Sequence, residues 1–150
     1  LSKFPRHLGD EAKDYDRMMS VIPEAAIAVK SNVSAMHDIT EGGVFGALWE
    51  LAESAGVGLT VDLKKLPIKQ TTAEICNFYD INPYELMSSG SMLMATDSGH
   101  DLVRALEEEH IHAVVVGKVT DSNDKIVING DETRFLEPPK TDELYKALQM

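Results

Sequence analysis

The stretch that decides the fold is MHDITEGGVFGALWELAESAGVG, residues 36–58. Its middle part repeats apolar residues every three or four positions, which predicts a helix over residues 40–55. One face of that helix holds Val44, Leu48, Leu51, Ala52 and Ala55. Phe45 and Trp49 form a second apolar pair four residues apart, so we expect the helix to be buried on more than one side.

Two adjacent glycines, Gly42 and Gly43, fall in the first turn of this predicted helix, after the expected N-cap Thr40. Glycine in a helix costs roughly 1 kcal/mol relative to alanine, so the pair needs a physical reason. One interpretation is a binding site, because bare amides at a helix N-terminus attract phosphate or carboxylate groups. The other is packing, in which the missing side chains let the helix approach a strand closely. The residues by themselves leave both interpretations open.

Helical and extended patterns are mixed along the rest of the chain. We predict helices at residues 9–19, 24–30, 72–79, 82–87, 99–110 and 141–148, and strands at 33–37, 59–63, 92–96, 112–119, 125–128 and 133–136. The valine run at 114–116 predicts that strand 112–119 is buried, and Asn129-Gly130 is a strong hairpin signal. This mixture predicts an α+β fold, a mixed β-sheet flanked by helices.

Composition narrows the classes of partner. The 150 residues carry a net charge of −11, which argues against nucleic acid because phosphate backbones need clustered Lys and Arg. No apolar run approaches the roughly 18 residues of a membrane span. A single cysteine, Cys76, allows no internal disulfide, which is typical of a cytoplasmic protein. We expect Cys76 to be a small buried apolar residue rather than a nucleophile.

The segment Asp38-Ile39-Thr40-Glu41-Gly42-Gly43 resembles the Asp-Pro-Thr-x-Gly-Gly motif of HypE-type members of the AIR synthase superfamily, with isoleucine in place of proline. That superfamily includes aminoimidazole ribonucleotide synthetase, the hydrogenase maturation protein HypE, selenophosphate synthetase and thiamine-monophosphate kinase. The similarity continues in order through LPI at 66–68, NPYELMSSGSMLMAT at 82–96 and VVVGKVT at 114–120. This colinearity favours the site interpretation of the glycine pair over the packing one.

The resemblance implies that residues 1–150 form one C-terminal domain of this superfamily. Within it we expect a helical lead-in at 1–32, a core at 33–136 and a C-terminal helix at 137–150. Such enzymes use ATP and Mg²⁺ to phosphorylate an amide or carbamoyl-type oxygen of a small-molecule substrate. Their N-terminal domain supplies most nucleotide and metal ligands and forms the homodimer. The implied substrate- or phosphate-binding residues here are Asp38, Thr40, Gly42 and Gly43, with no catalytic residue, metal ligand or cofactor belonging to this chain alone.

Two further features limit that expectation. HypE ends in a cysteine that accepts the carbamoyl group, whereas this chain ends in Gln149-Met150, so HypE's own reaction is not expected here. The isolated domain is not expected to be active, and a non-catalytic regulatory or assembly module that keeps the fold is the alternative. His37, His110 and His112 are interpreted as surface or hydrogen-bonded groups rather than ligands.

Overall fold

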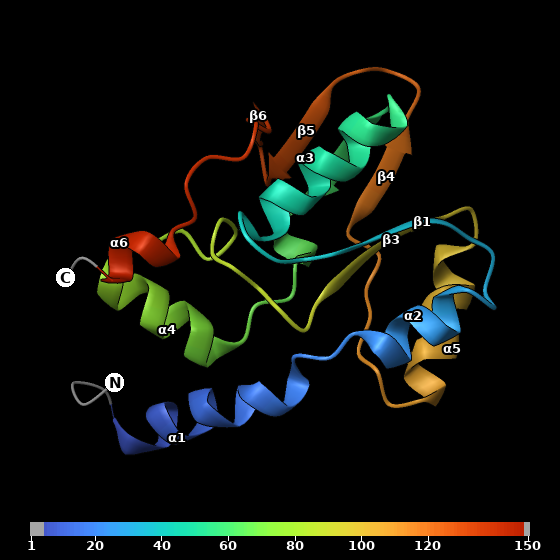
Figure 1. The fold of residues 1–150 in the computed structure, drawn as a ribbon. Helices are drawn as coiled ribbons and strands as arrows, with labels where there is room; N and C mark the ends of the chain where they lie inside the picture. Colours follow the sequence, from blue (N-terminus) through green and yellow to red (C-terminus); the bar gives the residue numbers. More distant parts are fainter. Residues whose placement is uncertain (1–4, 149–150) are drawn as a thin grey trace.

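The computed structural model describes residues 5–148 (Figure 1). Its helices are α1 (Arg6–Asp14), α2 (Ile22–Ala28), α3 (Gly43–Ala55), α4 (Gln70–Tyr79), α5 (Gly99–Glu108) and α6 (Leu144–Leu148), with 3₁₀ turns η1 (Tyr15–Met18) and η2 (Leu63–Lys65). Its strands are β1 (Val33–Asp38), β2 (Gly58–Asp62), β3 (Met92–Thr96), β4 (Gly117–Thr120), β5 (Lys125–Asn129) and β6 (Glu132–Phe135). None of these helices is both long and apolar enough to cross a lipid bilayer.

The strands form two sheets. Four strands lie in the order β4-β2-β5-β6, in which β2 and β5 run parallel and the outer pairs run antiparallel. The other sheet is the antiparallel pair β1–β3, whose strands are separated in sequence by α3, β2 and α4. The predicted α+β fold with a mixed sheet is therefore confirmed, but β1 and β3 form a ribbon of their own.

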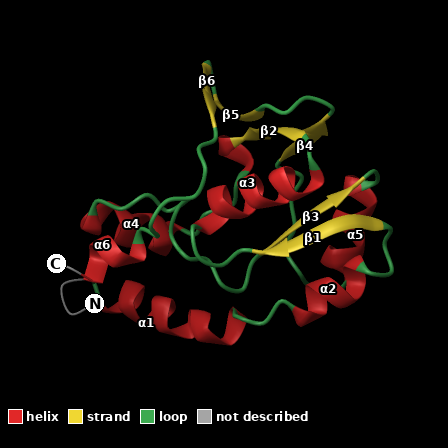
Figure 2. Ribbon diagram, turned by 45° about the horizontal axis from the view of Figure 1, so that its top comes forward, coloured by secondary structure: helices red, strands yellow, loops and turns green. Residues whose placement is uncertain are grey.

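Helix α3 lies between the four-stranded sheet and the β1–β3 ribbon (Figure 2). Its apolar side chains pack against β2 and β5 because those strands turn alternate residues toward it. The buried cluster consists of Phe45, Leu48, Ala52, Leu59, Val61, Val127 and Leu136. The prediction that α3 is buried on more than one side is confirmed, because the helix also contacts β1 and β3, and Ala47, outside this cluster, is 2% exposed.

Charged residues on α3 link it to both sheets. Glu50 lies 3.2 Å from Nε2 of His37 on β1, and Glu53 lies 2.8 Å from Nζ of Lys125 on β5. Around this centre, α1, α4 and α6 lie on one side of the molecule, and α2 and α5 pack together on the other (Figure 1). The hydroxyl of buried Thr71 on α4 donates a hydrogen bond to Glu11 on α1, which fixes the lead-in to the body.

Several predicted elements differ from those observed. Helix α3 begins at Gly43 rather than near Thr40, because Gly42 has a φ of 82° and cannot continue a helix in the N-terminal direction. The segment 82–87 forms turns instead of the predicted short helix, with the Asn82 side chain accepting a hydrogen bond from the Tyr84 amide. Local hydrogen bonds of this kind compete with helix formation.

The predicted buried strand at 112–119 is also wrong. Only residues 117–120 are extended, as edge strand β4, and Val119 is 55% exposed. The valine run 114–116 precedes this strand in irregular backbone, where Val114 is 39% exposed and Val116 packs against the core, so β-branched content alone does not establish a buried strand. At the C-terminus, α6 begins at Leu144, whose amide bonds to Asp142 rather than to the predicted cap Thr141, and residues 149–150 lie outside the described residues. The Asn129-Gly130 hairpin is confirmed, with Asn129 paired to Glu132.

Candidate functional site

The four predicted site residues lie together where β1 passes into α3, from Asp38 at the end of β1 to Gly43 at the start of α3, but they divide into two kinds. Asp38 and Thr40 have exposed side chains, and neither side chain hydrogen-bonds to another residue in the described range 5–148. Gly42 and Gly43 are buried. Between these pairs, Ile39 points into the core and is 6% exposed. In this segment the side chains of Asp38 and Thr40 therefore point to solvent, whereas the backbone of Gly42 and Gly43 is buried.

Gly42 is capped by a carboxylate from the far end of the chain. Its amide donates a 2.7 Å hydrogen bond to Oδ2 of Asp142, which is only 2% exposed. Oδ1 of Asp142 accepts two more amide bonds, from Met87 at 3.2 Å and Leu144 at 2.8 Å. The N-terminus of α3 thus holds an anionic group, as helix polarity favours, and that group belongs to the protein.

Gly43 is required by close backbone packing. It has a φ of 63°, and a Cβ at this position would lie 2.5 Å from the Tyr84 carbonyl oxygen and 2.7 Å from that of Leu86. Its amide bonds to the Thr40 carbonyl at 3.1 Å, and the Phe45 amide bonds to that of Tyr84 at 3.0 Å. The packing interpretation therefore accounts for this glycine, although the close neighbour is segment 84–86 and not a β-strand, as that interpretation expected.

Asp142 and Glu143 are functional candidates that sequence reasoning missed. Glu143 is 5% exposed, accepts the Asn82 amide at 3.0 Å and pairs with Lys146 at 2.6 Å. Burial acts to raise the pKa of Glu143, but the hydrogen bonds from Lys146 and Asn82 outweigh it, so the pKa lies below its usual value. In the sequence, an acidic pair just before a short helix indicates a helix cap. It does not indicate that Asp142 accepts a hydrogen bond from Gly42, 100 residues away.

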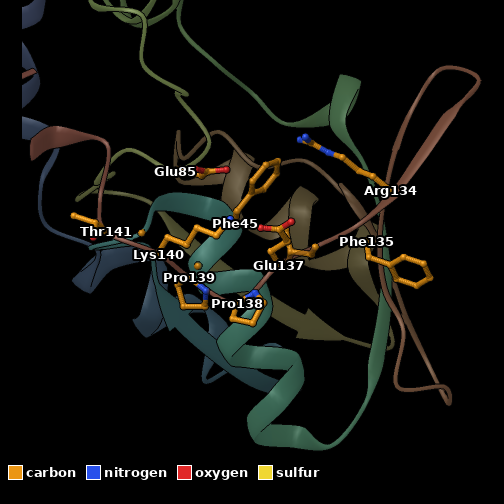
Figure 3. A pocket seen from close by; sticks show the side chains of 12 residues that line it. Phe45, Glu85, Arg134, Phe135, Glu137, Pro138, Pro139, Lys140 and Thr141 are labelled. Carbon is orange, nitrogen blue, oxygen red and sulfur yellow. Dashed lines mark hydrogen bonds and ion pairs between the residues drawn. The ribbon is translucent and has the colours of Figure 1, made fainter. Parts of the chain in front are cut away.

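A pocket of about 280 Å³ adjoins the buried side of this turn. Residues Gly42, Phe45 and Gly46 of the α3 start form one wall, and segment 134–141 forms the other. Figure 3 shows Arg134 and Lys140 reaching toward Phe45 from opposite sides, with Glu137 between them and Phe135 pointing away. Glu85 completes the set of charged side chains in the lining.

The charges around this pocket alternate in sign. The Arg134 guanidinium lies 5.2 Å from the centre of the Phe45 ring, whose other neighbour is the stacked ring of Tyr84. Lys140 forms an ion pair with Glu137, and its hydrogen bond and charge hold the pKa of Glu137 below the usual value, with a smaller contribution from Arg134. The same hydrogen bond raises the pKa of Lys140, and the charge of Glu85 adds to the effect.

Other candidates resolve more simply. Cys76 is 1% exposed, which confirms its predicted burial, and desolvation raises the pKa of its thiol, so the thiolate is disfavoured. His37 pairs with Glu50, and its Nδ1 lies 2.6 Å from the Asp38 carbonyl oxygen. Across residues 5–148 no three His, Cys, Asp or Glu side chains converge in a way that could hold a metal ion.

Residues 2–129 match the family model described as AIR synthase related protein, C-terminal domain. The chain belongs to this family. It is 32% identical over 101 residues to a Methanocaldococcus jannaschii protein named for hydrogenase expression and formation, covering 64% of this chain and 30% of that protein. It is 25% identical over 122 residues to carbamoyl dehydratase HypE of Rhizobium leguminosarum bv. viciae, covering 79% of this chain and 35% of that protein. The matched part of this chain thus spans about a third of the length of these two relatives.

Solved structures share the fold of this AIR synthase-related domain. E. coli HypE matches with a TM-score of 0.74 over 84% of this chain and 41% of its own, at 20% identity. A structure of HypE in complex with ATP matches with a TM-score of 0.64 over 73% of this chain and 37% of its own, at 18% identity. These matches confirm the predicted AIR synthase C-terminal domain-like fold.

Proposed function

We propose that this AIR synthase-related chain is the substrate-positioning domain of an ATP-dependent enzyme. In this proposal it works with an N-terminal ATP-binding domain and places a small-molecule substrate, through an amide or carbamoyl-type oxygen, for phosphorylation. The turn from Asp38 to Gly43 supplies the contact with substrate or phosphate. The homodimer and the cytoplasmic location expected of the full-length protein remain predictions.

The observation that carries the proposal is the division of labour within this turn. Gly42 and Gly43 hold the backbone rigidly against Asp142 and segment 84–86, while the side chains of Asp38 and Thr40 project from it. Rigid backbone beneath free polar side chains is the arrangement that a positioning site needs, because a loose site loses orientation. The Thr40 hydroxyl can donate or accept a hydrogen bond and the Asp38 carboxylate accepts them, which suits the orientation of a substrate.

Among residues 5–148 no three His, Cys, Asp or Glu side chains converge, so the proposal rests on no all-protein metal cage in this part of the chain. Phosphoryl transfer from ATP depends on bound Mg²⁺ and a phosphate cradle. In our proposal the metal and most nucleotide contacts therefore belong to the N-terminal domain. A relative, HypE, binds ATP as a larger protein, of which this chain spans 37%.

A second candidate function has its own support. Every hydrogen bond given above for the Gly42 and Gly43 amides is made within the chain, so packing alone explains both glycines. A non-catalytic regulatory or assembly module would keep this packing and dispense with the exposed polar side chains. The two functions differ in what they require of Thr40.

The test replaces Thr40 with valine and Asp38 with asparagine in the protein that contains both domains. We expect ATP turnover, measured as phosphate release, to fall at least about tenfold in kcat/KM, the effect of losing one hydrogen bond to a charged group. Both side chains are exposed, so Tm should stay unchanged, and Glu41→Gln in the same turn is the matched control. Unchanged turnover in both variants would favour the assembly module.

A further inference from the structure

The charged side chains around the pocket beside α3 form an open row. Glu85, Lys140, Glu137 and Arg134 alternate in sign, and neighbours in the row interact electrostatically. The two inner members, Lys140 and Glu137, form an ion pair with each other. The two end members are Arg134 and Glu85, and Glu85 also interacts electrostatically with Lys146 on α6. This row deepens the proposed function, on which the biological meaning of the pocket rests.

Arg134 is the cationic end. No carboxylate among residues 5–148 lies within ion-pair distance of its guanidinium, which is held instead over the Phe45 ring at 5.2 Å. Aromatic stacking restricts the guanidinium without consuming its donors, so its hydrogen-bonding fork remains available to an anion. Arg134 stands on the strand face that packs against α3, because its partner across the hairpin is the fully buried Val127.

Glu85 is the anionic end. Its Oε1 accepts a 3.0 Å hydrogen bond from the Asn82 side chain, which orients the carboxylate, and an ionised carboxylate has further acceptor sites. Its main chain is fixed as well, because the Glu143 amide bonds to its carbonyl at 3.4 Å. Figure 3 shows Glu85 and Arg134 on opposite sides of the Phe45 ring.

Between these ends the pocket has a mixed lining, in which Pro138, Pro139 and Leu136 add apolar surface to the charged side chains. On the inner wall Gly42 and Gly46 add no side chain beside the Phe45 ring. A Cβ on Gly42 would lie 3.5 Å from Pro139, so a larger residue there would reduce the space. A volume of about 280 Å³ suits a small molecule rather than a nucleotide.

We propose that this pocket binds a small molecule that carries an anionic group for Arg134 and a hydrogen-bond-donating nitrogen for Glu85. Such a molecule closes the row of alternating charges, since each of its ends meets the opposite charge. The anion is a phosphate or a carboxylate, and the donor is an amine or an amide. The substrate class of the proposed enzyme is therefore an anionic amine or amide of small size.

The test uses phosphoethanolamine, which carries both groups, with inorganic phosphate, acetate and ethanolamine as single-group probes. Binding to the 150-residue chain is measured by calorimetry and by amide shifts in NMR spectra. We expect phosphoethanolamine to bind at least about tenfold more tightly than any single-group probe, because two charge-assisted contacts replace one. The shifts should include Gly42, Gly46 and residues 134–141. Comparison of phosphate with acetate shows which anion Arg134 prefers.

Variants locate the two contacts. Arg134→Gln should remove phosphate binding, and Glu85→Gln should reduce phosphoethanolamine to the affinity of phosphate while keeping the acceptor for Asn82. Arg104→Gln on α5, where the arginine pairs with Asp101, is the matched control, and the Tm of each variant reports folding. Equal affinity for phosphoethanolamine and phosphate, or binding that survives Arg134→Gln, overturns the proposal.

A third variant separates this proposal from the proposed function. Thr40→Val leaves the pocket lining intact, so probe binding to the isolated chain should not change. If Thr40→Val lowers ATP turnover in the full protein while the pocket fails to bind any probe, the turn retains its role and the pocket assignment is wrong. If the pocket binds and Thr40→Val has no effect on turnover, the pocket stands and the function of the turn is wrong.

Discussion

At the scale of single residues, the glycine pair shows how one sequence feature serves two structural needs. Gly42 gives the left-handed backbone that aims its amide at Asp142, and Gly43 makes room for two carbonyl groups. Both needs arise from segments far away in sequence, residues 84–86 and residue 142. The sequence suggested that a bound phosphate or carboxylate accepts the amide hydrogen bond at the start of α3. In the structure the Asp142 side chain accepts the Gly42 amide.

Replacing Gly43 with alanine should destabilise the protein by about 3 kcal/mol or more, because strain at positive φ adds to a clash with backbone. Gly56→Ala is a matched control, since Gly56 has the same φ of 63° and open space around its Cβ. That control should cost only about 1 kcal/mol, measured as the free energy of unfolding in urea. Equal losses in the two variants would show that close packing at Gly43 has no energetic weight.

Replacing Asp142 with asparagine should lower the free energy of unfolding by about 2–3 kcal/mol, because three amides lose a charged acceptor in a buried setting. Asp131→Asn, in the exposed β5–β6 turn, should change stability by less than about 0.5 kcal/mol. Thermal or urea unfolding of the two variants measures the difference. A small loss for Asp142→Asn would mean that water or the new amide replaces the carboxylate.

At the scale of elements, short segments depended most on tertiary context. Helix α3 and strand β3 were predicted with the right type because each has a clear apolar pattern, and β3 matched at both ends. Segments 82–87 and 112–119 were not, because Tyr84 and Val116 pack against the core from turns and irregular backbone, which tertiary contacts and the Asn82 hydrogen bond impose. Helix α6 is similar, since its five residues are too few to be stable without docking.

The docking of α6 should depend on pH through Glu143. Its folded-state pKa is below the unfolded value, so its contribution to stability is present above the unfolded pKa of about 4.3 and is lost as pH falls through the folded pKa. Glu143→Gln should therefore be less stable than the native protein at pH 7, and the gap should close in acid. Urea unfolding at several pH values measures this, with exposed Glu108→Gln as control. A gap that is constant with pH would contradict the assignment.

At the scale of the whole molecule, the described residues form the fold of an AIR synthase-related C-terminal domain. Two sheets enclose α3, and the core extends from Phe45 to Leu136. Among residues 5–148, however, no metal-binding cluster is found, and the chain spans about a third of relatives such as HypE. The family relationship therefore assigns a fold and a domain type, while the reaction stays a proposal.

The 150-residue chain alone should not hydrolyse ATP, because our proposal assigns the Mg²⁺ and most nucleotide contacts to the N-terminal domain, and phosphoryl transfer needs both. A coupled phosphate-release assay with Mg²⁺ and ATP tests this, and addition of an N-terminal ATP-binding domain should restore turnover. Magnesium-dependent hydrolysis by the pure chain, retained after repeated purification, would place nucleotide chemistry in this domain and contradict the proposed division of labour.

The sequence by itself determined the α+β class, the family, the central helix and the burial of Cys76, because apolar periodicity and colinear motifs are local properties of the chain. It also placed Asp38, Thr40, Gly42 and Gly43 in one turn. Only the tertiary structure decided that Asp142 accepts the Gly42 amide, and that Gly43 packs against the carbonyls of Tyr84 and Leu86. It also decided that Arg134 and Glu85 line one pocket. These contacts join residues 40 to 100 positions apart, and hydrogen bonds and charge pairing at such separations leave no pattern in a single sequence.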